Sequence, residues 1–274
     1  MPRGRDTRRE RGVGGLVLVD KPVGPSSFAV VRRAKKRHGL KAGHAGTLDP
    51  QASGLLLVLL GPATRLARYL VGLDKRYVTE IELGRRTATG DAEGDLLEVT
   101  PLPEDLDGAL AALVGEVDLR VPAASAVKVD GERAYRLHRK GVAVEMPFRR
   151  STVHALSLRR VELPVVELEL HVSSGTYVRA IADALGGHCR TLRRTAVGPF
   201  RVEDADEERV LPPLAALPLL PELELVGEEL GRILSGQPVA RDGDGRACLT
   251  WGGQLVAVAR LAGGLARPET VIAP

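Results

Sequence analysis

Residues 43–60 constrain the fold of this chain more than any other stretch, because a glycine-rich polar turn leads directly into a purely apolar segment. Within the turn, Gly43 to Pro50, a histidine and an aspartate lie among glycines, and Asp49 directly precedes a proline. A residue before proline is held in extended geometry, because the proline ring clashes with a helical predecessor. Asp49 is therefore predicted to project from a loop, and loops on a rigid scaffold are where catalytic residues concentrate.

The apolar segment Leu55 to Leu60 predicts a central strand, because it has strand length and no polar side chain. From Tyr77 to Leu83, every second side chain is expected on the same face of an extended chain, and this alternation indicates a half-buried strand. Three further strands are expected over Leu16–Val19, Val153–Leu158 and Val166–Val172. Strands interspersed with short helical segments predict an α+β fold.

The best-marked helix is expected over Phe28–His38, with Ser27 as its N-cap and Gly39 at its end. Its apolar face is expected to carry three residues, which are Phe28, Val31 and Ala34. Other short helices are predicted over Ala63–Leu70, over Ala134–Arg139 and over Tyr177–Leu185. A further helix is predicted to follow the prolines at 101 and 103 and to end at Val114.

The domain boundaries are expected from composition. Residues 1–13 read as a disordered basic arm, and residues 14–210 as one main domain. Within it, residues 123–150 form a long basic loop, and a loop of that length in a compact domain is usually functional. Prolines punctuate a linker over 211–221, and short strands with many turns predict a small β-rich domain over 222–274.

Positive charge is concentrated in three runs, although the chain of 274 residues has a formal charge of only +4. The first run is the arm 1–13, the second begins at Arg32 and ends at Arg37, and the third spans Arg190 to Arg194. Localised positive charge suits a polyanionic partner, since each neutralised phosphate releases counterions. A solvated arginine-rich surface remains the other interpretation of any single run.

Several classes of protein are disfavoured by what the sequence lacks. Two cysteines are too few for a disulfide framework or a cysteine metal site, and no apolar run reaches the length of a membrane span. The N-terminus has no apolar signal core, so a cytoplasmic location is expected. The absence of a metal-ligand cluster, a Walker loop or a dinucleotide fingerprint predicts that no metal and no cofactor is required.

Six sequence blocks, in order, closely resemble the TruB family of tRNA pseudouridine synthases, whose bacterial members act on uridine 55. The resemblance runs from about Gly15 to Phe200 and departs from the family at Ala124, where an aromatic residue is common, and in a shorter segment before Leu192. The blocks are Lys21-Pro22, Gly43 to Pro50, Lys75-Arg76-Tyr77, Leu83 to Asp91, Ser125 to Lys128 with Arg133-Ala134-Tyr135, and Ser174 to Arg179.

The resemblance implies that uridine at position 55 in the T-arm loop of tRNA is isomerised. The bond from N1 to C1′ breaks, the uracil rotates, and C5 is joined to C1′. The family assigns the reacting carboxylate to Asp49, its partner guanidinium to Arg179, and the clamp on the base to Tyr77. Further substrate contacts are implied at four positions, which are Lys21, His44, Tyr177 and Leu192.

The residues alone leave other interpretations open. From periodicity, Tyr77 is a core residue of a strand, and Arg179 is an ordinary surface arginine on a helix. Lys21 is equally a solvated lysine, and His44 a histidine that hydrogen-bonds a turn. Leucine cannot read uracil through its side chain, so only the main chain of Leu192 could contact the base.

The family also implies an architecture and a set of partners. It predicts a pseudouridine synthase fold, with a central mixed, largely antiparallel sheet flanked by helices, and a small C-terminal domain similar to a reduced PUA-type RNA-binding domain. It implies that residues 123–150 grip the T-arm stem-loop of tRNA. The enzyme is expected to work as a monomer, without a membrane or an obligate protein partner.

Two other functions remain compatible with the sequence. One is a guide-RNA-dependent pseudouridine synthase, although the short C-terminal domain argues against it. The other is a tRNA-binding or tRNA-folding protein whose catalysis is incidental, since base flipping and a basic surface would serve that role too. Replacing Asp49 with asparagine separates an enzyme from a pure binder.

Overall fold

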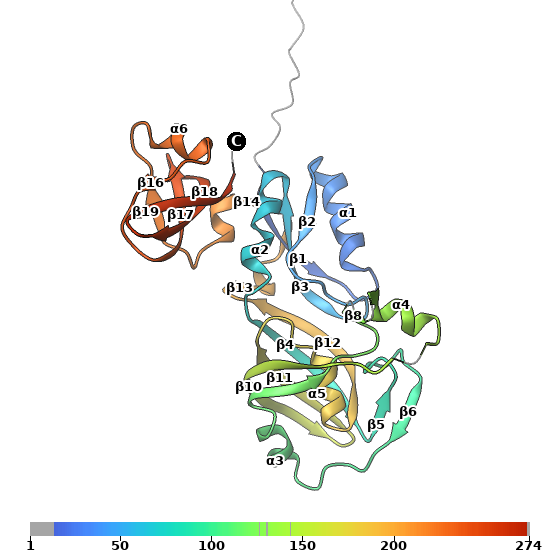
Figure 1. Cartoon of the computed structure of the whole chain (residues 1–274). Helices are drawn as coiled ribbons and strands as arrows, with labels where there is room; N and C mark the ends of the chain where they lie inside the picture. The colour runs from blue at the N-terminus through green and yellow to red at the C-terminus, as the bar shows by residue number, and fades with distance from the viewer. Residues whose placement is uncertain (1–13, 126, 130, 143, 273–274) are drawn as a thin grey trace, which may run out of the picture.

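The computed structural model describes residues 14–125, 127–129, 131–142 and 144–272. The expected basic arm over residues 1–13 lies outside the described residues. Within them, a ten-stranded sheet forms the larger part of the molecule, and a separate five-stranded sheet forms the C-terminal part (Figure 1). This arrangement confirms the expected α+β architecture.

The large sheet is mixed but almost entirely antiparallel. Its strands are β1 Leu16–Lys21, β2 Ala42–His44, β3 Ser53–Leu60, β4 Lys75–Leu83, β7 Gly115–Arg120, β10 Phe148–Glu162, β11 Val165–Val172, β12 Gly187–Val197, β13 Phe200–Arg201 and β14 Asp206–Leu211. The order across the sheet is β14-β1-β3-β12-β4-β11-β10-β7, with β2 paired to β3 and β13 to β12. Strands β3 and β12 run parallel to each other, and the other described neighbours run antiparallel.

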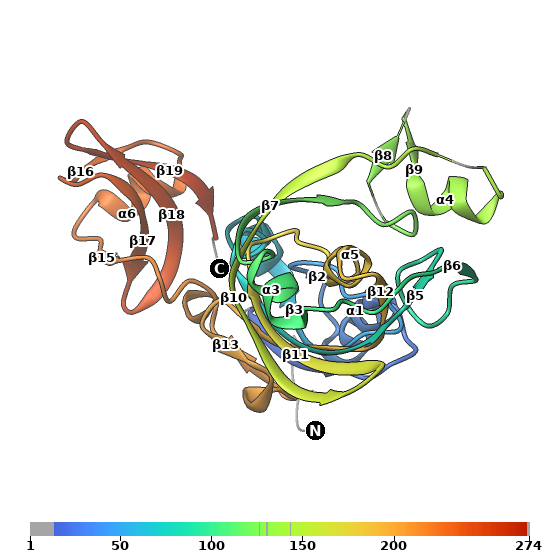
Figure 2. The same ribbon diagram turned by 90° about the horizontal axis from the view of Figure 1, so that it is seen from below.

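The helices are short, and they cover the sheet and its ends. They are α1 Ser27–His38, α2 Ala67–Leu70, α3 Leu106–Ala111, α4 Ala134–Arg139, α5 Val178–Ala184 and α6 Glu229–Leu234, with 3-10 segments η1 Gly61–Leu66, η2 Val202–Asp204 and η3 Pro213–Ala216. Figure 2 shows α3 and α5 inside the curve of the sheet. No described helix has both the length and the apolar character needed to cross a bilayer.

Two small hairpins and the C-terminal sheet complete the fold. The hairpins are β5 Arg85–Thr87 with β6 Leu96–Val99, and β8 Lys128–Val129 with β9 Glu132–Arg133. The C-terminal strands are β15 Glu222–Glu224, β16 Val239–Ala240, β17 Gly245–Trp251, β18 Gln254–Ala262 and β19 Leu265–Val271. Hairpin β8–β9 and α4 project beyond the curve of the main sheet (Figure 2).

Strand β3 is purely apolar because both of its faces are buried. Leu56 and Val58 join the core cluster that contains the residues of β4, β11 and α5. Leu55 and Leu57 join a second cluster on the opposite face, which also contains Val258 and other residues of the C-terminal sheet. A strand that is covered on both sides reads as a continuous hydrophobic run, as expected for Leu55–Leu60.

Helix α1 begins one residue earlier than expected. Ser26 is the N-cap, and its hydroxyl accepts a hydrogen bond from the backbone N–H of Ala29 at 3.2 Å. Ser27 is instead the first helical residue and is buried. Phe28 was expected on the core face, but its side chain is 66% exposed, because Val30 with Val31 and Ala34 form the buried face. Gly39 ends the helix in the left-handed conformation, as predicted.

The segment between Pro212 and Pro221 packs against the core, although its prolines suggested a linker. Pro213, Ala216 and Leu217 are buried, and η3 contacts both β1 and β18. The C-terminal sheet lies beside the main sheet (Figure 1). Because Leu255 and Val258 belong to the same apolar cluster as β1 and β3, the two sheets share buried contacts.

Both cysteines are expected to be chemically silent in the folded protein. Burial raises the pKa of the Cys189 thiol to about 12 and that of the Cys248 thiol to about 11, and the thiolate is the reactive species. We predict no reaction with a thiol reagent at pH 8 in buffer, and two reactive thiols per chain in denaturant. Rapid labelling of either cysteine in the native protein would contradict this burial.

Candidate active site

Asp49 and Arg179 form the centre of the site, although they are 130 residues apart in the sequence. Nη2 of Arg179 donates to Oδ2 of Asp49 at 2.8 Å. The Arg179 side chain is 3% exposed and that of Asp49 is 32% exposed. The planar guanidinium holds the carboxylate in a defined orientation, so Asp49 presents a fixed, negatively charged group that solvent or a substrate can reach.

The loop of Asp49 is fastened to the start of α1. The Ser27 hydroxyl accepts a hydrogen bond from the N–H of Leu48 at 2.8 Å and donates to the Leu48 carbonyl oxygen at 2.7 Å. Both groups are buried, so the exchange is protected from water. The residue before Asp49 therefore has little freedom, which is why the helix needs a serine rather than an apolar residue at position 27.

Lys21 fastens the other side of the same loop. Its side chain is fully buried, and Nζ donates to the carbonyl oxygens of Pro22 at 2.8 Å, Pro25 at 3.0 Å and Pro50 at 3.3 Å. Burial lowers the pKa of Lys21, and the charge of Asp49 opposes that shift. The interpretation of Lys21 as a solvated lysine is therefore wrong. Its ammonium group ties the backbone of Pro50, directly after Asp49, to that of Pro22 and Pro25.

Arg194 is a residue of the site region that the sequence did not reveal. It was counted in the third basic run, but its side chain is 1% exposed. Nε donates to the carbonyl oxygen of Leu55 at 2.8 Å, and the two Nη atoms donate to Thr47 at 3.2 Å and Gly46 at 3.3 Å. Arg194 thus supports the glycine-rich turn from its buried side, and its guanidinium is not available to a polyanion at the surface.

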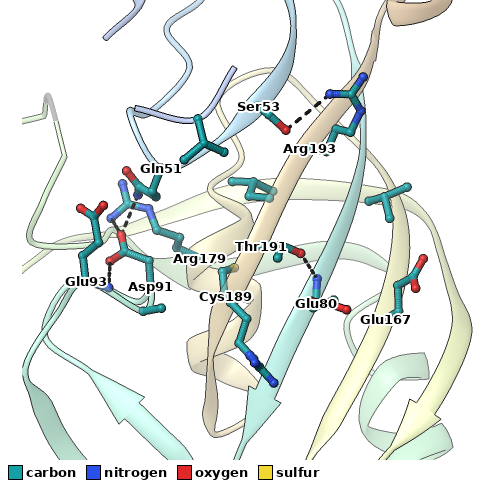
Figure 3. Close-up of a pocket in the computed structure, with 15 residues that line it drawn as sticks. Gln51, Ser53, Glu80, Asp91, Glu93, Glu167, Arg179, Cys189, Thr191 and Arg193 are labelled. Atoms are coloured by element: carbon teal, nitrogen blue, oxygen red, sulfur yellow. Dashed lines mark hydrogen bonds and ion pairs between the residues drawn. The ribbon is translucent and has the colours of Figure 1, made fainter. Parts of the chain in front are cut away.

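Asp91 was also missed, and it completes the surroundings of Arg179. Its carboxylate is buried, with Oδ2 3.5 Å from Nη1 of Arg179 and 2.7 Å from Nε2 of Gln51 (Figure 3). Arg179 also donates to the carbonyl oxygens of Thr89 at 2.6 Å and Ala124 at 3.0 Å. The guanidinium therefore lies between two carboxylates, of which only Asp49 opens to solvent.

The aromatic residues of the proposed site pack in the same core cluster as the sequence neighbours of this pair. Tyr77 lies in β4, is 8% exposed, and belongs to the core cluster that contains Leu48 and Val178, the sequence neighbours of Asp49 and Arg179. Tyr177 precedes α5 and packs on the same cluster. The interpretation of Tyr77 as a strand residue of the core is thus correct for its ring, and its contact with a base stays a prediction.

Tyr177 and Leu192 connect this core to two neighbouring surfaces. Tyr177 also packs on a small cluster of Val121, Ala134 and Met146, which is formed largely by residues 123–150 themselves. Leu192 lies opposite Thr79 of β4 and packs on the main core cluster. Tyr177 therefore links residues of the loop to the main core, and Leu192 links β12 to the same core.

His44 lies at the end of β2, opposite Val58 of β3. Burial lowers the pKa of its imidazole, and the charge of Arg194 adds to this effect. Its Nδ1 atom is buried without a hydrogen-bond partner among the described residues. A hydrogen bond with the backbone of Gly46 opposes the lowering of its pKa, which favours the interpretation of a histidine that bonds the turn, and its stacking on RNA stays a prediction.

A groove of about 710 Å³ is lined in part by Arg179 and Asp91 (Figure 3). It has acidic and basic side chains on its wall, so it can offer both donors and acceptors. Asp49 and Tyr77 lie outside its lining. The lining residues are Val23, Gln51, Ser53, Val78, Glu80, Asp91, Ala92, Glu93, Glu167, Arg179, Cys189, Arg190, Thr191, Leu192 and Arg193.

The basic run of α1 is partly paired with acids. Arg33 and Arg37 both contact Glu207 of β14, at 2.5 and 3.1 Å, and Arg37 also contacts Glu208 at 3.1 Å. The guanidinium of Arg32 lies 5.7 Å from the centre of the Phe28 ring. The side chains of these ion pairs are all partly exposed. Exposed ion pairs contribute little to stability, so a phosphate could replace the carboxylate partner of either arginine at small cost.

Comparison with known proteins agrees with this geometry. Residues 32–178 match the family model described as TruB family pseudouridylate synthase, N-terminal domain. A tRNA pseudouridine synthase B from Cupriavidus pinatubonensis is 38% identical over 96% of this chain and 95% of its own length. Another from a Mycobacterium species (strain KMS) is 46% identical over 70% of each chain.

A solved structure gives the same result at lower sequence similarity. A chain in the crystal structure of a Cbf5–Nop10–Gar1 complex superposes with a TM-score of 0.70 and 26% identity, covering 95% of this chain and 85% of that chain. The motif that carries Asp49 and the strand that carries Tyr77 both fall inside the family match, and Arg179 directly follows it. The chain belongs to the TruB family of pseudouridylate synthases.

Proposed function

We propose that this chain isomerises uridine to pseudouridine in tRNA, at position 55 of the T-arm loop. The observation that carries the proposal is the solvent-accessible Asp49 carboxylate held at 2.8 Å by a buried Arg179. An isomerisation that keeps the base needs a negative group at the sugar, a clamp on the uracil and an acceptor for the C5 proton. The family relationship supports this reaction at this site.

Asp49 supplies the negative group. A carboxylate can form a bond to carbon and later leave, as in covalent glycoside chemistry. Arg179 stabilises the charge of this carboxylate and fixes its orientation. The reaction is an isomerisation, so no atom is gained or lost overall. The glycosidic bond to N1 breaks, the new bond forms between C5 and C1′, and the proton on C5 is transferred to an acceptor while N1 gains one.

Four of the remaining site residues position the nucleotide. Tyr77 stacks on the everted uracil, and its hydroxyl accepts the C5 proton directly or through water. Tyr177 packs against the target nucleotide, and the main chain of Leu192 contacts the base. His44 stacks in the RNA and stabilises the everted state.

Binding of the RNA has to offset base flipping, which costs a few kcal/mol. We assign the phosphate contacts to the arm 1–13, to α1 and to residues 123–150. We assign a PUA-like RNA-binding role to residues 222–274, which follow the packed proline-rich segment. RNA recognised in this way is read mainly through its shape and its splayed bases. The enzyme acts in the cytoplasm as a monomer, without a protein partner.

The test uses the purified chain and an unmodified tRNA transcript, without other proteins or guide RNA. We expect release of tritium from 5-labelled uridine and pseudouridine mapped at position 55. A transcript with cytidine at 55 is the control and should show neither. The homologous Cbf5 chain is found in a complex with Nop10 and Gar1, so activity that appears only after adding a guide RNA and partner proteins would favour the guide-dependent alternative. Tight tRNA binding with no turnover would favour the tRNA-folding alternative.

Asp91→Asn is predicted to impair catalysis without unfolding the protein. Asparagine has the size of aspartate and can still accept a hydrogen bond from Gln51, but it removes the buried negative charge beside Arg179. Misplacing the guanidinium, and with it Asp49, is expected to lower kcat about 10²-fold. Asp183→Asn is the control, since Asp183 lies one turn after Arg179 in α5 and also pairs with an arginine, but its partner is Arg86. Single-turnover kinetics and thermal denaturation measure both variants, and an unchanged kcat for Asp91→Asn would contradict the role.

A further inference from the structure

Asp74, His154 and His171 converge at one end of the main sheet and have no part in the proposed reaction. Their oxygen and nitrogen ligand atoms all lie within 4.8 Å of one another. Oδ2 of Asp74 is 3.2 Å from Nε2 of His154 and 3.9 Å from Nε2 of His171. The two imidazole rings are 4.7 Å apart and tilted by 43°. One carboxylate oxygen therefore faces two imidazole nitrogens at the same time.

The backbone explains why these three side chains meet. Strands β4, β11 and β10 are neighbours in the sheet, and Asp74 directly precedes β4. The register between β10 and β11 shifts between Val153 and Ala155, which leaves His154 as the extra residue of a bulge beside His171. Bulges re-aim side chains and often lie at functional positions. Asp74, His154 and His171 thus come from neighbouring positions at the same end of three adjacent strands.

The neighbouring contacts hold the cluster in place. The carbonyl oxygen of Asp74 accepts a hydrogen bond from the N–H of Gly198 at 2.8 Å. The next residue, Lys75, is buried and donates to the Ser174 hydroxyl at 3.0 Å. Ser173 exchanges backbone and side-chain hydrogen bonds with Thr152 at the same end. The three potential ligands therefore project from a backbone that is already ordered.

We propose that Asp74, His154 and His171 form a binding site for a divalent transition metal, with Zn²⁺ as the fitting ion. Two imidazole nitrogens and one carboxylate oxygen are ligands that Zn²⁺ takes at about 2.0–2.2 Å, and tetrahedral geometry then separates the ligand atoms by roughly 3.4 Å. The measured separations of 3.2 and 3.9 Å bracket that value. Imidazole ligands disfavour Mg²⁺ and Ca²⁺, which prefer oxygen.

The geometry leaves a fourth coordination position for water, because three protein groups supply three ligands. The side chains are between 27% and 43% exposed, so the ion has access from solvent. A metal here would join three adjacent strands at the end from which the chain continues through residues 173–177 to α5. None of the three ligands has a role in the proposed reaction, so the bound ion would stabilise the folded chain independently of the Asp49 chemistry.

The test is metal binding to the untagged full chain after treatment with a chelator. Titration with Co²⁺ should produce d–d absorption bands that saturate at one equivalent, and Zn²⁺ should displace them. Calorimetry with Zn²⁺ should give one site per chain, Zn²⁺ should raise the Tm, and Mg²⁺ should do neither. Each of His154→Ala, His171→Ala and Asp74→Asn is expected to weaken Zn²⁺ binding by at least about tenfold.

His38→Ala is the matched control, because His38 lies outside the cluster and bonds the backbone of Glu207. It should bind Zn²⁺ as the parent chain does. The absence of stoichiometric binding, or binding that persists in the double variant His154→Ala/His171→Ala, overturns the proposal. Circular dichroism on the variants separates loss of the site from loss of the fold, and pseudouridine formation by the metal-free chain is expected to continue.

Discussion

Asp49→Asn is expected to abolish pseudouridine formation while tRNA binding is retained. Asparagine has the size of aspartate and can still accept a hydrogen bond from Arg179, so the loop keeps its shape. It lacks the negative charge and the nucleophilic oxygen that the reaction needs. Loss of a reacting nucleophile typically costs about 10⁴-fold or more in kcat. Tritium release from 5-labelled tRNA measures the loss, and a gel-shift assay measures the binding.

Asp20→Asn is the matched control for this prediction. Asp20 is also paired with an arginine, since Arg193 contacts both of its oxygens at 2.7 and 3.0 Å. This pair is exposed, and such pairs contribute little to stability. Asp20→Asn should therefore turn over tRNA at nearly the parental rate. A comparable loss of activity in both variants, or near-parental activity in Asp49→Asn, contradicts the assignment of Asp49.

The fold was largely predictable from hydrophobic patterns. The alternation of Tyr77 to Leu83 corresponds to a strict buried and half-buried alternation along β4. The uninterrupted run Leu55–Leu60 corresponds to a strand covered on both faces. Phe28 shows where this reasoning fails: its spacing placed it with Val31 and Ala34, but the buried face of α1 begins at Ser27, whose hydroxyl bonds the Asp49 loop.

Strand β12 was missed because its pattern is not amphipathic in the usual way. Its central part contains Thr191 with Arg193 and Arg194, which reads as a polar loop or basic patch. Consecutive residues of a strand point to opposite faces, so one arginine of the pair faces solvent and the other faces inward. The Arg193–Arg194 doublet would have indicated a buried arginine if the strand had been predicted.

The site itself rested on resemblance rather than on spacing. Nothing in the local sequence connects Asp49 to Arg179, because the contact crosses 130 residues and depends on where α5 packs on the sheet. Asp91 is the last residue of one of the six matching blocks. Its role was not predicted, because a threonine- and glycine-rich turn usually places an aspartate in solvent. Here the turn is folded inward, and Gln51 caps the carboxylate.

Arg194→Met is expected to destabilise the protein more than any single exposed substitution. Methionine fills part of the volume but donates no hydrogen bond, so the carbonyl oxygens of Gly46, Thr47 and Leu55 lose a buried donor. An unsatisfied buried polar group costs about 1–3 kcal/mol. With several carbonyls affected, we expect a loss of roughly 3 kcal/mol or more in the free energy of unfolding, measured by urea denaturation.

Arg193→Met provides the control on the neighbouring residue of the same strand. Its guanidinium is 42% exposed and contacts Asp20, so its removal should change the free energy of unfolding by less than about 1 kcal/mol. Arg194→Met should also lower kcat under conditions where it remains folded, because the turn leading to Asp49 loses its support from below. Equal stability of the two variants would show that the hydrogen bonds of Arg194 do not hold the turn. The burial of a charged side chain beneath the reacting loop would then need another explanation, since an arginine surrounded by apolar strands is costly unless its donors are used.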